Sequence, residues 1–366
     1  MGSLKMVDLH RQYVAHKPAI DEAIAAVLQT TGFIRGAQLG AFEEALAAYH
    51  GAAHVVTCGS GTDALQIAYM ALGIGPGDEV ITTPFTFVAT VEALVLLGAR
   101  PVYVDIDLRT YNIDVAQIEA RITDRTKAIV PVHLYGQPVD MDPLLALANS
   151  RGIPVIEDNA QAIGARYRGR MTGTMGSMGC LSFFPAKNLG CFGDGGAIVT
   201  NDAKLAQQCR LIANHGSQKR YFHEVIGINS RLDTLQAAVL LAKLPHLEAF
   251  NDGRIRVAKM YDEAFANLSV VAPWVSPDVR HVYQQYSIRC DRRDVLMQHL
   301  DAASIPYAIH YPRPLHLQPA FASQVPSGTR FPNAELAAAE ILSLPLFPEM
   351  TDDEINQVIA AVTSFG

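Results

Sequence analysis

Between residues 53 and 200 the sequence alternates short apolar runs with helical stretches, and this alternation restricts the possible folds more than any other feature. The pattern is typical of a parallel sheet with helices on its faces. The expected strands are Ala53–Thr57, Glu79–Thr82, Pro101–Val104, Ala128–Val132 and Pro154–Glu157, followed by Met178–Phe184 and Ala197–Thr200. The expected helices between the first five strands are Thr62–Leu72, Phe87–Leu97, Asp114–Arg121 and Met141–Asn149. The sequence therefore predicts an α/β fold.

The pattern changes after residue 200. Two long helical stretches, Arg231–Leu244 and His246–Asn267, meet at Pro245, which can stop or kink a helix. Short strands and proline-rich loops follow, and the last expected helix covers Asp352–Thr363. A chain of 366 residues is long enough for two domains. We expect a large α/β domain over residues 1–245, including an N-terminal arm, and a smaller α+β domain over residues 246–366.

Charge and composition argue against several classes of protein. The 36 Asp and Glu residues outnumber the 29 Lys and Arg residues, which disfavours nucleic acid as the main partner. No apolar run approaches the length of a membrane helix, and residues 1–13 lack the apolar core of a secretory signal. The five cysteines form no C-x-x-C pair, and no H-E-x-x-H motif occurs. We therefore expect a cytoplasmic protein with reduced thiols and no metal site.

The first candidate site is Gly59–Leu65, a glycine-rich segment between an expected strand and an expected helix. Free backbone amides and the helix dipole at such a helix start can hold a phosphate group. The segment matches neither a dinucleotide-binding motif nor a P-loop. A plain turn in which Thr62 or Asp63 caps the helix is the other interpretation.

Two further candidates follow along the chain. Asp158 lies at the carboxyl end of an expected strand, where it could keep a pyridine nitrogen protonated or simply cap a helix. Lys187 lies in the apolar segment Leu181–Gly190, five residues after Ser182. Burial favours the neutral amine, which can attack an aldehyde, although a single lysine is usually an exposed loop residue. Phosphate cradle, acid and lysine occur in the order that one cofactor, pyridoxal 5′-phosphate (PLP), would need.

Five segments resemble, in sequence order, the motifs of the nucleotide-sugar aminotransferases of the DegT family. These enzymes have the aspartate-aminotransferase-like fold (type I) of PLP-dependent transferases, so the resemblance implies a large domain with a mostly parallel sheet covered by helices. The segments are Gly59–Leu65, Thr83–Thr90, Glu157–Gln161, Ser182–Lys187 and Gly227–Asp233, and the resemblance runs from about Met6 to the C-terminus. Some members carry histidine in place of the lysine and are dehydratases, so Lys187 indicates an aminotransferase.

The resemblance implies a role for each matching residue. Lys187 would form a Schiff base with the cofactor and move the proton in both halves of a ping-pong transamination with glutamate as the expected amino donor. Asp158 would pair with the pyridinium nitrogen. The other implied cofactor contacts are Gln161 at the ring hydroxyl, Phe87 on the ring face, Gly61, Thr62, Asp63 and Ser182 at the phosphate, and Asn229 at the phosphate from the second subunit of a homodimer. Without the resemblance, Phe87 would be interpreted as a core aromatic residue.

The sugar substrate is also suggested by resemblance. The run His310-Tyr311-Pro312 with Arg231 is similar to the branch that aminates C-3 of UDP-2-acetamido-2-deoxy-3-oxo-glucuronate, with Arg231, His310 and Tyr311 as sugar contacts and a role in lipopolysaccharide O-antigen synthesis. From the residues alone, Arg231 could equally bind a nearby carbonyl or acid, and Ile309–His316 could be an ordinary surface loop. The alternatives are a dTDP-3-oxo-6-deoxyhexose 3-aminotransferase, a 4-oxo-sugar 4-aminotransferase and a non-catalytic regulatory homologue.

Overall fold

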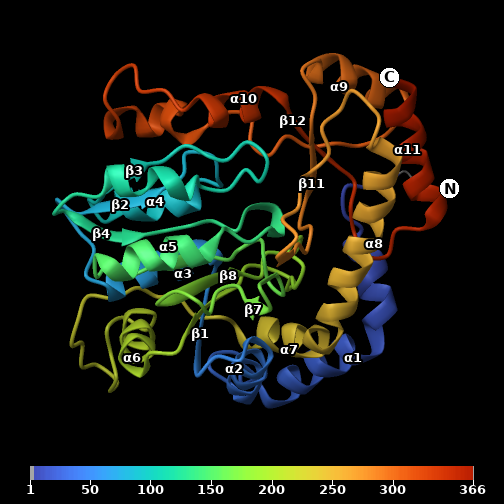
Figure 1. Cartoon of the computed structure of the whole chain (residues 1–366). Coiled ribbons are helices and arrows are strands. Elements are labelled where there is room, and N and C mark those ends of the chain that lie inside the picture. Colours follow the sequence, from blue (N-terminus) through green and yellow to red (C-terminus); the bar gives the residue numbers. More distant parts are fainter. Residues whose placement is uncertain (1–3, 366) are drawn as a thin grey trace.

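The computed structural model describes residues 4–365 (Figure 1). The helices are α1 (Leu9–Thr30), α2 (Ala37–His50), α3 (Gly61–Ala71), α4 (Ala89–Leu96), α5 (Met141–Ser150), α6 (Ala203–Ile212), α7 (Thr234–Lys243), α8 (Leu247–Phe265), α9 (Arg293–Ala302), α10 (Pro332–Glu340) and α11 (Asp352–Phe365). The strands are β1 (His54–Cys58), β2 (Glu79–Thr82), β3 (Arg100–Tyr103), β4 (Thr126–Ile129), β5 (Ile156–Asp158), β6 (Arg166–Tyr167), β7 (Arg170–Met171), β8 (Met178–Ser182), β9 (Gly196–Thr200), β10 (Val279–Arg280), β11 (Tyr286–Arg289) and β12 (Ile341–Leu344).

The central sheet confirms the predicted α/β fold. Its two parts, β1-β9-β8-β5 and β4-β2-β3, are joined by parallel pairing of Ile129 with Val155 and of Val132 with Asp158. Within this sheet β9 runs antiparallel to β1 and β8, while the pairs β5–β8, β2–β4 and β2–β3 are parallel. The carboxyl ends of β5 and β8 therefore lie side by side at one edge of the sheet.

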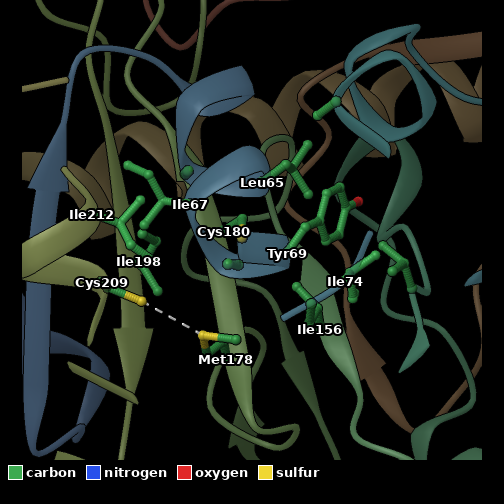
Figure 2. Packing of buried hydrophobic residues seen from close by; sticks show 14 of the residues in the cluster. Leu65, Ile67, Tyr69, Ile74, Ile156, Met178, Cys180, Ile198, Cys209 and Ile212 are labelled. Atoms are coloured by element: carbon green, nitrogen blue, oxygen red, sulfur yellow. Dashed lines mark hydrogen bonds between the residues drawn. The ribbon is translucent and has the colours of Figure 1, made fainter. Parts of the chain in front are cut away.

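Both faces of the sheet are apolar, because consecutive side chains of a strand point to opposite faces. Val56, Cys180 and Ile198 pack in a cluster with α3, α4 and α6, whereas their neighbours Val55, Leu181 and Val199 pack with α2 and α7. Figure 2 shows Leu65, Ile67 and Tyr69 of α3 packed beside Ile156, Met178, Cys180 and Ile198. This packing holds the first turn of α3 close to the ends of β5 and β8.

Some expected elements differ from those observed. The segment Asp114–Arg121 forms two short 3-10 helices, Val115–Gln117 and Glu119–Arg121, and Asp114 caps the first by accepting a hydrogen bond from the Ala116 amide. The strand β2 has the expected bounds, and the other expected strands and helices begin or end within three residues of theirs. Two of these shifts matter for the site: α4 begins at Ala89, after Phe87, and α7 begins at Thr234, after Arg231.

The C-terminal part of the chain contributes to two cores. Residues of α8, α9, α11, β11 and β12 pack together, with Leu4 and Val7 from the N-terminal segment against them. Phe331, Ala334 and Ala337 instead pack with Phe85 and Tyr103 of the sheet region. A 3-10 turn, Leu244–His246, separates α7 from α8 at the expected domain boundary. A turn between two helices does not by itself divide domains, and the division between residues 245 and 246 stays a prediction. Residues 1–3 of the expected large domain and residue 366 of the expected small domain lie outside the described residues.

Within residues 4–365, no helix has the length and apolar character needed to cross a membrane.

Candidate active site

A cavity of about 470 Å³ lies at the carboxyl ends of β5 and β8, beside the first turn of α3. It brings together nine of the residues singled out in the sequence: Gly61, Thr62, Phe87, Asp158, Gln161, Ser182, Lys187, His310 and Tyr311. These residues come from five separate segments of the chain, and those that follow β5 and β8 meet because parallel strands end at one edge of the sheet.

The start of α3 forms one wall of this cavity. Ser60 is the N-cap: its Oγ accepts a hydrogen bond from the Asp63 amide at 3.1 Å, and its carbonyl accepts one from Ala64. This corrects the interpretation of Thr62 or Asp63 as the cap. The amides of Gly61 and Thr62 precede the first intrahelical hydrogen bond, so they remain available to an anion. A Cβ on Gly61 would lie 2.6 Å from Ser182 Cβ, which explains why glycine occupies this position.

Asp158 ends β5 and is almost completely buried, at 5% exposure. Its Oδ2 accepts a hydrogen bond from Thr90 Oγ1 at 2.8 Å, and its Oδ1 accepts one from the Ala160 amide at 3.2 Å. Burial raises the pKa of Asp158, and the bonds from Thr90 and Ala160 and the charge of Lys187 act in the opposite direction. No helix follows directly, so the alternative role of Asp158 as a helix cap is wrong.

Lys187 lies in the loop between β8 and β9, and its side chain lines the cavity. The loop is tied on both sides, because Cys191 N donates to the Phe183 carbonyl and Asn188 Nδ2 donates to Asn251 Oδ1 at 2.7 Å. Among the described residues, Lys187 Nζ has no hydrogen bond or ion pair. Burial lowers the pKa of Lys187 to about 8, against the opposing effect of Asp158. This amine can therefore lose its proton near neutral pH, which an ordinary loop lysine cannot.

Gln161, His310 and Tyr311 form a connected group on another wall. Gln161 Oε1 accepts a hydrogen bond from the Tyr135 amide at 2.6 Å, and its Nε2 donates to Tyr311 Oη at 3.1 Å. His310 Nδ1 lies 2.9 Å from Ser343 Oγ on β12. Burial lowers the pKa of His310, and the charge of Lys187 lowers it further, so the imidazole is neutral near pH 7. The segment Ile309–His316 is thus no ordinary surface loop.

Phe87 lies in the turn before α4 and is 53% exposed. Its ring lines the cavity, 6.1 Å from the ring of Tyr311 between centroids. The interpretation of Phe87 as a core aromatic residue is therefore wrong.

Three of the predicted site residues lie outside this cavity. The Asp63 carboxylate accepts a hydrogen bond from Ser230 Oγ at 2.6 Å, so it holds the segment before α7. Asn229 is exposed, and Arg231 lines a separate small cavity with Arg35 and Arg210. Arg231 Nη1 donates to Asn214 Oδ1 at 3.4 Å. Within a single chain, Asp63, Asn229 and Arg231 do not meet the other site residues.

The sequence reasoning also missed residues that belong to this region. Thr86, Gln284 and Gln285 line the cavity, and Thr90 lies directly behind Asp158. Thr86 and Thr90 occur in the segment Thr83–Thr90, but Thr86 precedes the helix that contains Thr90, so helical spacing gave no signal that pairs them. Nothing in the sequence distinguishes Gln284 and Gln285.

The chemistry of the cavity fits a phosphorylated pyridine aldehyde. Free amides beside Ser182 suit the phosphate, a carboxylate at the sheet edge suits a basic ring nitrogen, and an amine with a lowered pKa suits the aldehyde. A metal site finds no support in residues 4–365, where no group of three His, Cys, Asp or Glu residues could hold an ion.

Comparison with known proteins agrees with this chemistry. The model of the DegT/DnrJ/EryC1/StrS aminotransferase family matches residues 15–363. The chain is 48% identical to a "pleiotropic regulatory protein" of Geobacillus stearothermophilus, over 99% of this chain and 98% of that protein. It is also 48% identical to the UDP-2-acetamido-2-deoxy-3-oxo-D-glucuronate aminotransferase of Pseudomonas aeruginosa, over 99% of this chain and 100% of that enzyme.

Solved structures agree with both the fold and the cofactor. One is the crystal structure of Streptomyces venezuelae DesV in complex with a ketimine intermediate, with a TM-score of 0.97 and 44% sequence identity. The match covers 100% of this chain and 99% of the DesV chain. NtdA from Bacillus subtilis, solved with its bound cofactor PMP, has a TM-score of 0.90 at 34% identity and covers 96% and 82% of the two chains. The chain therefore belongs to the DegT/DnrJ/EryC1/StrS family of aminotransferases, and its cofactor is pyridoxal 5′-phosphate.

Proposed function

We propose that this sugar aminotransferase transfers an amino group from glutamate to C-3 of UDP-2-acetamido-2-deoxy-3-oxo-glucuronate. The observation that carries the proposal is the conjunction of Lys187, Asp158, His310 and Tyr311 in one cavity. The relative that is named for this uronate is 48% identical over nearly the whole chain, which supports this choice of sugar.

Lys187 is the proposed catalytic residue. When bound, PLP acts as an electron sink for the negative charge that develops at the carbon losing its proton. The neutral Lys187 amine would accept that proton and pass it to C4′ of the cofactor, and in the second half of the reaction it would carry a proton the opposite way, from C4′ to the sugar carbon that receives the amino group. Asp158 holds the ring nitrogen in its protonated form, and Gln161 contacts the ring hydroxyl. Phe87 packs on the ring face, while Gly61, Thr62 and Ser182 bind the phosphate.

A second copy of the chain completes the proposed site. The anionic groups of a nucleotide-linked uronate need positive charge, but among the residues lining the cavity only Lys187 offers it, since the His310 imidazole is neutral near pH 7. Asn229 is exposed, and the Arg231 guanidinium has no carboxylate partner among the described residues. In a homodimer, Asn229 of one subunit would contact the phosphate of the other subunit's cofactor. Arg231 would bind the sugar carboxylate.

The proposed setting is the cytoplasm, in the synthesis of a lipopolysaccharide O-antigen. All five cysteines are free and buried, which is compatible with a reducing compartment.

The substrate is tested by assaying the purified protein with glutamate and three keto-sugars: the UDP-linked 3-oxo-uronate, a dTDP-3-oxo-6-deoxyhexose and a 4-oxo sugar. We expect turnover of the uronate and its loss in Lys187→Ala, with Lys204→Ala, at an exposed position, as the control. Turnover of a dTDP-sugar or a 4-oxo sugar without the uronate would reject the proposed substrate.

A non-catalytic regulator is the second candidate, since one relative at 48% identity is named as a regulatory protein. A non-catalytic regulator would convert no keto-sugar, and Lys187→Ala would leave its regulatory activity intact.

A further inference from the structure

Behind the cavity, a chain of two hydroxyl groups leads to Asp158. Thr90 Oγ1 donates to Asp158 Oδ2 at 2.8 Å, and Thr86 Oγ1 lies 3.0 Å from Thr90 Oγ1. Thr90 has 0% exposure and is not among the residues that line the cavity, so it cannot touch a ligand there. Its hydroxyl reaches the site only through the Asp158 carboxylate.

The direction of these hydrogen bonds depends on the charge of Asp158. An ionised carboxylate can only accept, so the single hydroxyl hydrogen of Thr90 points to Asp158 and Thr86 must donate to Thr90. Successive donors polarise one another and strengthen the last bond. A protonated Asp158 would offer Thr90 either a hydroxyl, which reverses the chain, or a neutral carbonyl oxygen, which is a weaker acceptor than a carboxylate. The arrangement therefore favours the ionised form.

Asp158 has few other groups that offset its burial. The Ala160 amide donates to the second carboxylate oxygen at 3.2 Å, and the charges nearby belong to Lys187 and His133. Lys187 loses its positive charge near pH 8, and once its amine is bound to the cofactor it no longer offers that ammonium group. Thr90 does not line the cavity, so its bond to Asp158 requires no group that the cofactor would occupy.

The position of Thr90 is itself held from the opposite side. Tyr69 of α3 is completely buried, and its Oη donates to the Thr90 carbonyl at 3.0 Å. Tyr69 thus contacts the backbone of Thr90 and leaves the hydroxyl free for Asp158. A change at Tyr69 therefore removes a bond to the Thr90 backbone, whereas a change at Thr90 removes the bond to Asp158. Comparing the two variants separates the effect of the hydroxyl from the effect of disturbing the helix.

We propose that Thr90 is a positioning residue, which keeps Asp158 ionised and aimed at the ring nitrogen of the cofactor. The inference rests on the proposed role of Asp158. Thr90 then contributes to the affinity for PLP only through the interaction between Asp158 and the ring nitrogen.

The test compares two ligands of the apoprotein by calorimetric titration: PLP, and 1-deazapyridoxal 5′-phosphate, in which a C–H group replaces the ring nitrogen. Both ligands carry the same aldehyde, hydroxyl and phosphate. We expect Thr90→Val to weaken PLP binding about 10-fold, the effect of one hydrogen bond to a charged group, and to change binding of the analogue by less than about 2-fold. Thr90→Ser keeps the hydroxyl and should return PLP affinity to within about 3-fold of the wild type.

Tyr69→Phe is the matched control, and it should leave the ratio of the two affinities unchanged. If Thr90→Val does not fold, Thr90→Ala tests the same ratio with a smaller side chain. An unchanged ratio in the Thr90 variants, with wild-type protein that prefers PLP, would overturn the role of Thr90 alone. Wild-type protein without a preference for PLP over the analogue would overturn the proposed role of Asp158 as well.

Discussion

The pKa of Lys187 is the property on which catalysis near neutral pH depends. Burial lowers this pKa from an ordinary value of 10.5 to about 8. At pH 7 about 9% of such an amine is neutral, against about 0.03% for an ordinary lysine, so Lys187 should react with an electrophile roughly 300-fold faster than an ordinary lysine of equal access. Replacing Asp158 with Asn removes the charge that opposes this shift and should lower the pKa of Lys187 further.

Competitive acetylation of the apoprotein, read by peptide mass spectrometry at several pH values, measures this property. The extent of Lys187 labelling should follow a titration curve with its midpoint near pH 8, and Asp158→Asn should move that midpoint to lower pH. Lys243 provides an internal control: its pKa is also lowered to about 8, but it is only 2% exposed and should stay protected. A Lys187 midpoint above pH 10, or equal labelling of Lys187 and Lys243, would refute the reasoning.

Three more outcomes follow from other parts of the molecule. Glu157 is fully buried and accepts hydrogen bonds from His133 Nε2 and the Gly173, Met175 and Gly176 amides, so Glu157→Gln should lower the free energy of unfolding by about 3 kcal/mol in urea titration. The exposed Glu119→Gln should change it by less than about 0.5 kcal/mol. Burial raises the pKa of Glu79, but Arg100, Thr123 and Arg125 outweigh it and lower that pKa to about 2. The stability that Glu79 contributes should therefore be present above pH 4.5 and disappear as the pH falls to about 2, so the unfolding curves of the wild type and Glu79→Gln should converge in acid. Equal mixtures of Lys187→Ala and Asn229→Ala protein should regain about one quarter of wild-type activity if subunits share sites, since half of the dimers would then hold one intact site; no recovery would count against the shared site.

The order of strands and motifs along the chain was sufficient to predict the main architecture. Parallel strands end at one edge of a sheet, so residues that follow different strands meet without any knowledge of the loops. For this reason Gly61, Asp158, Ser182 and Lys187 lie in one cavity as the motif order indicated. Apolar runs buried on both faces are also a local signal, and they identified β2, β8 and β9 to within a few residues.

Local signals were insufficient where two local interactions compete. Ser60, Thr62 and Asp63 can each cap a helix, and the path of the chain after β1 selected Ser60. The short segment Asp114–Arg121 has the composition of a helix, but the side chain of Asp114 satisfies a tighter 3-10 turn.

Only the tertiary structure decided which polar groups act together over long sequence separations. Thr90 bonds to Asp158, 68 positions further along the chain, because α4 packs at the end of β5. Lys243 has the sequence position of an exposed residue at a helix end, but the loop after Lys187 covers it, and its Nζ donates to the Gly190 carbonyl. Local sequence sets which segments are strands and helices and where each motif lies relative to them. The depth to which a charge is buried, and the partner that satisfies it, depend on distances between segments that are set only when the elements pack.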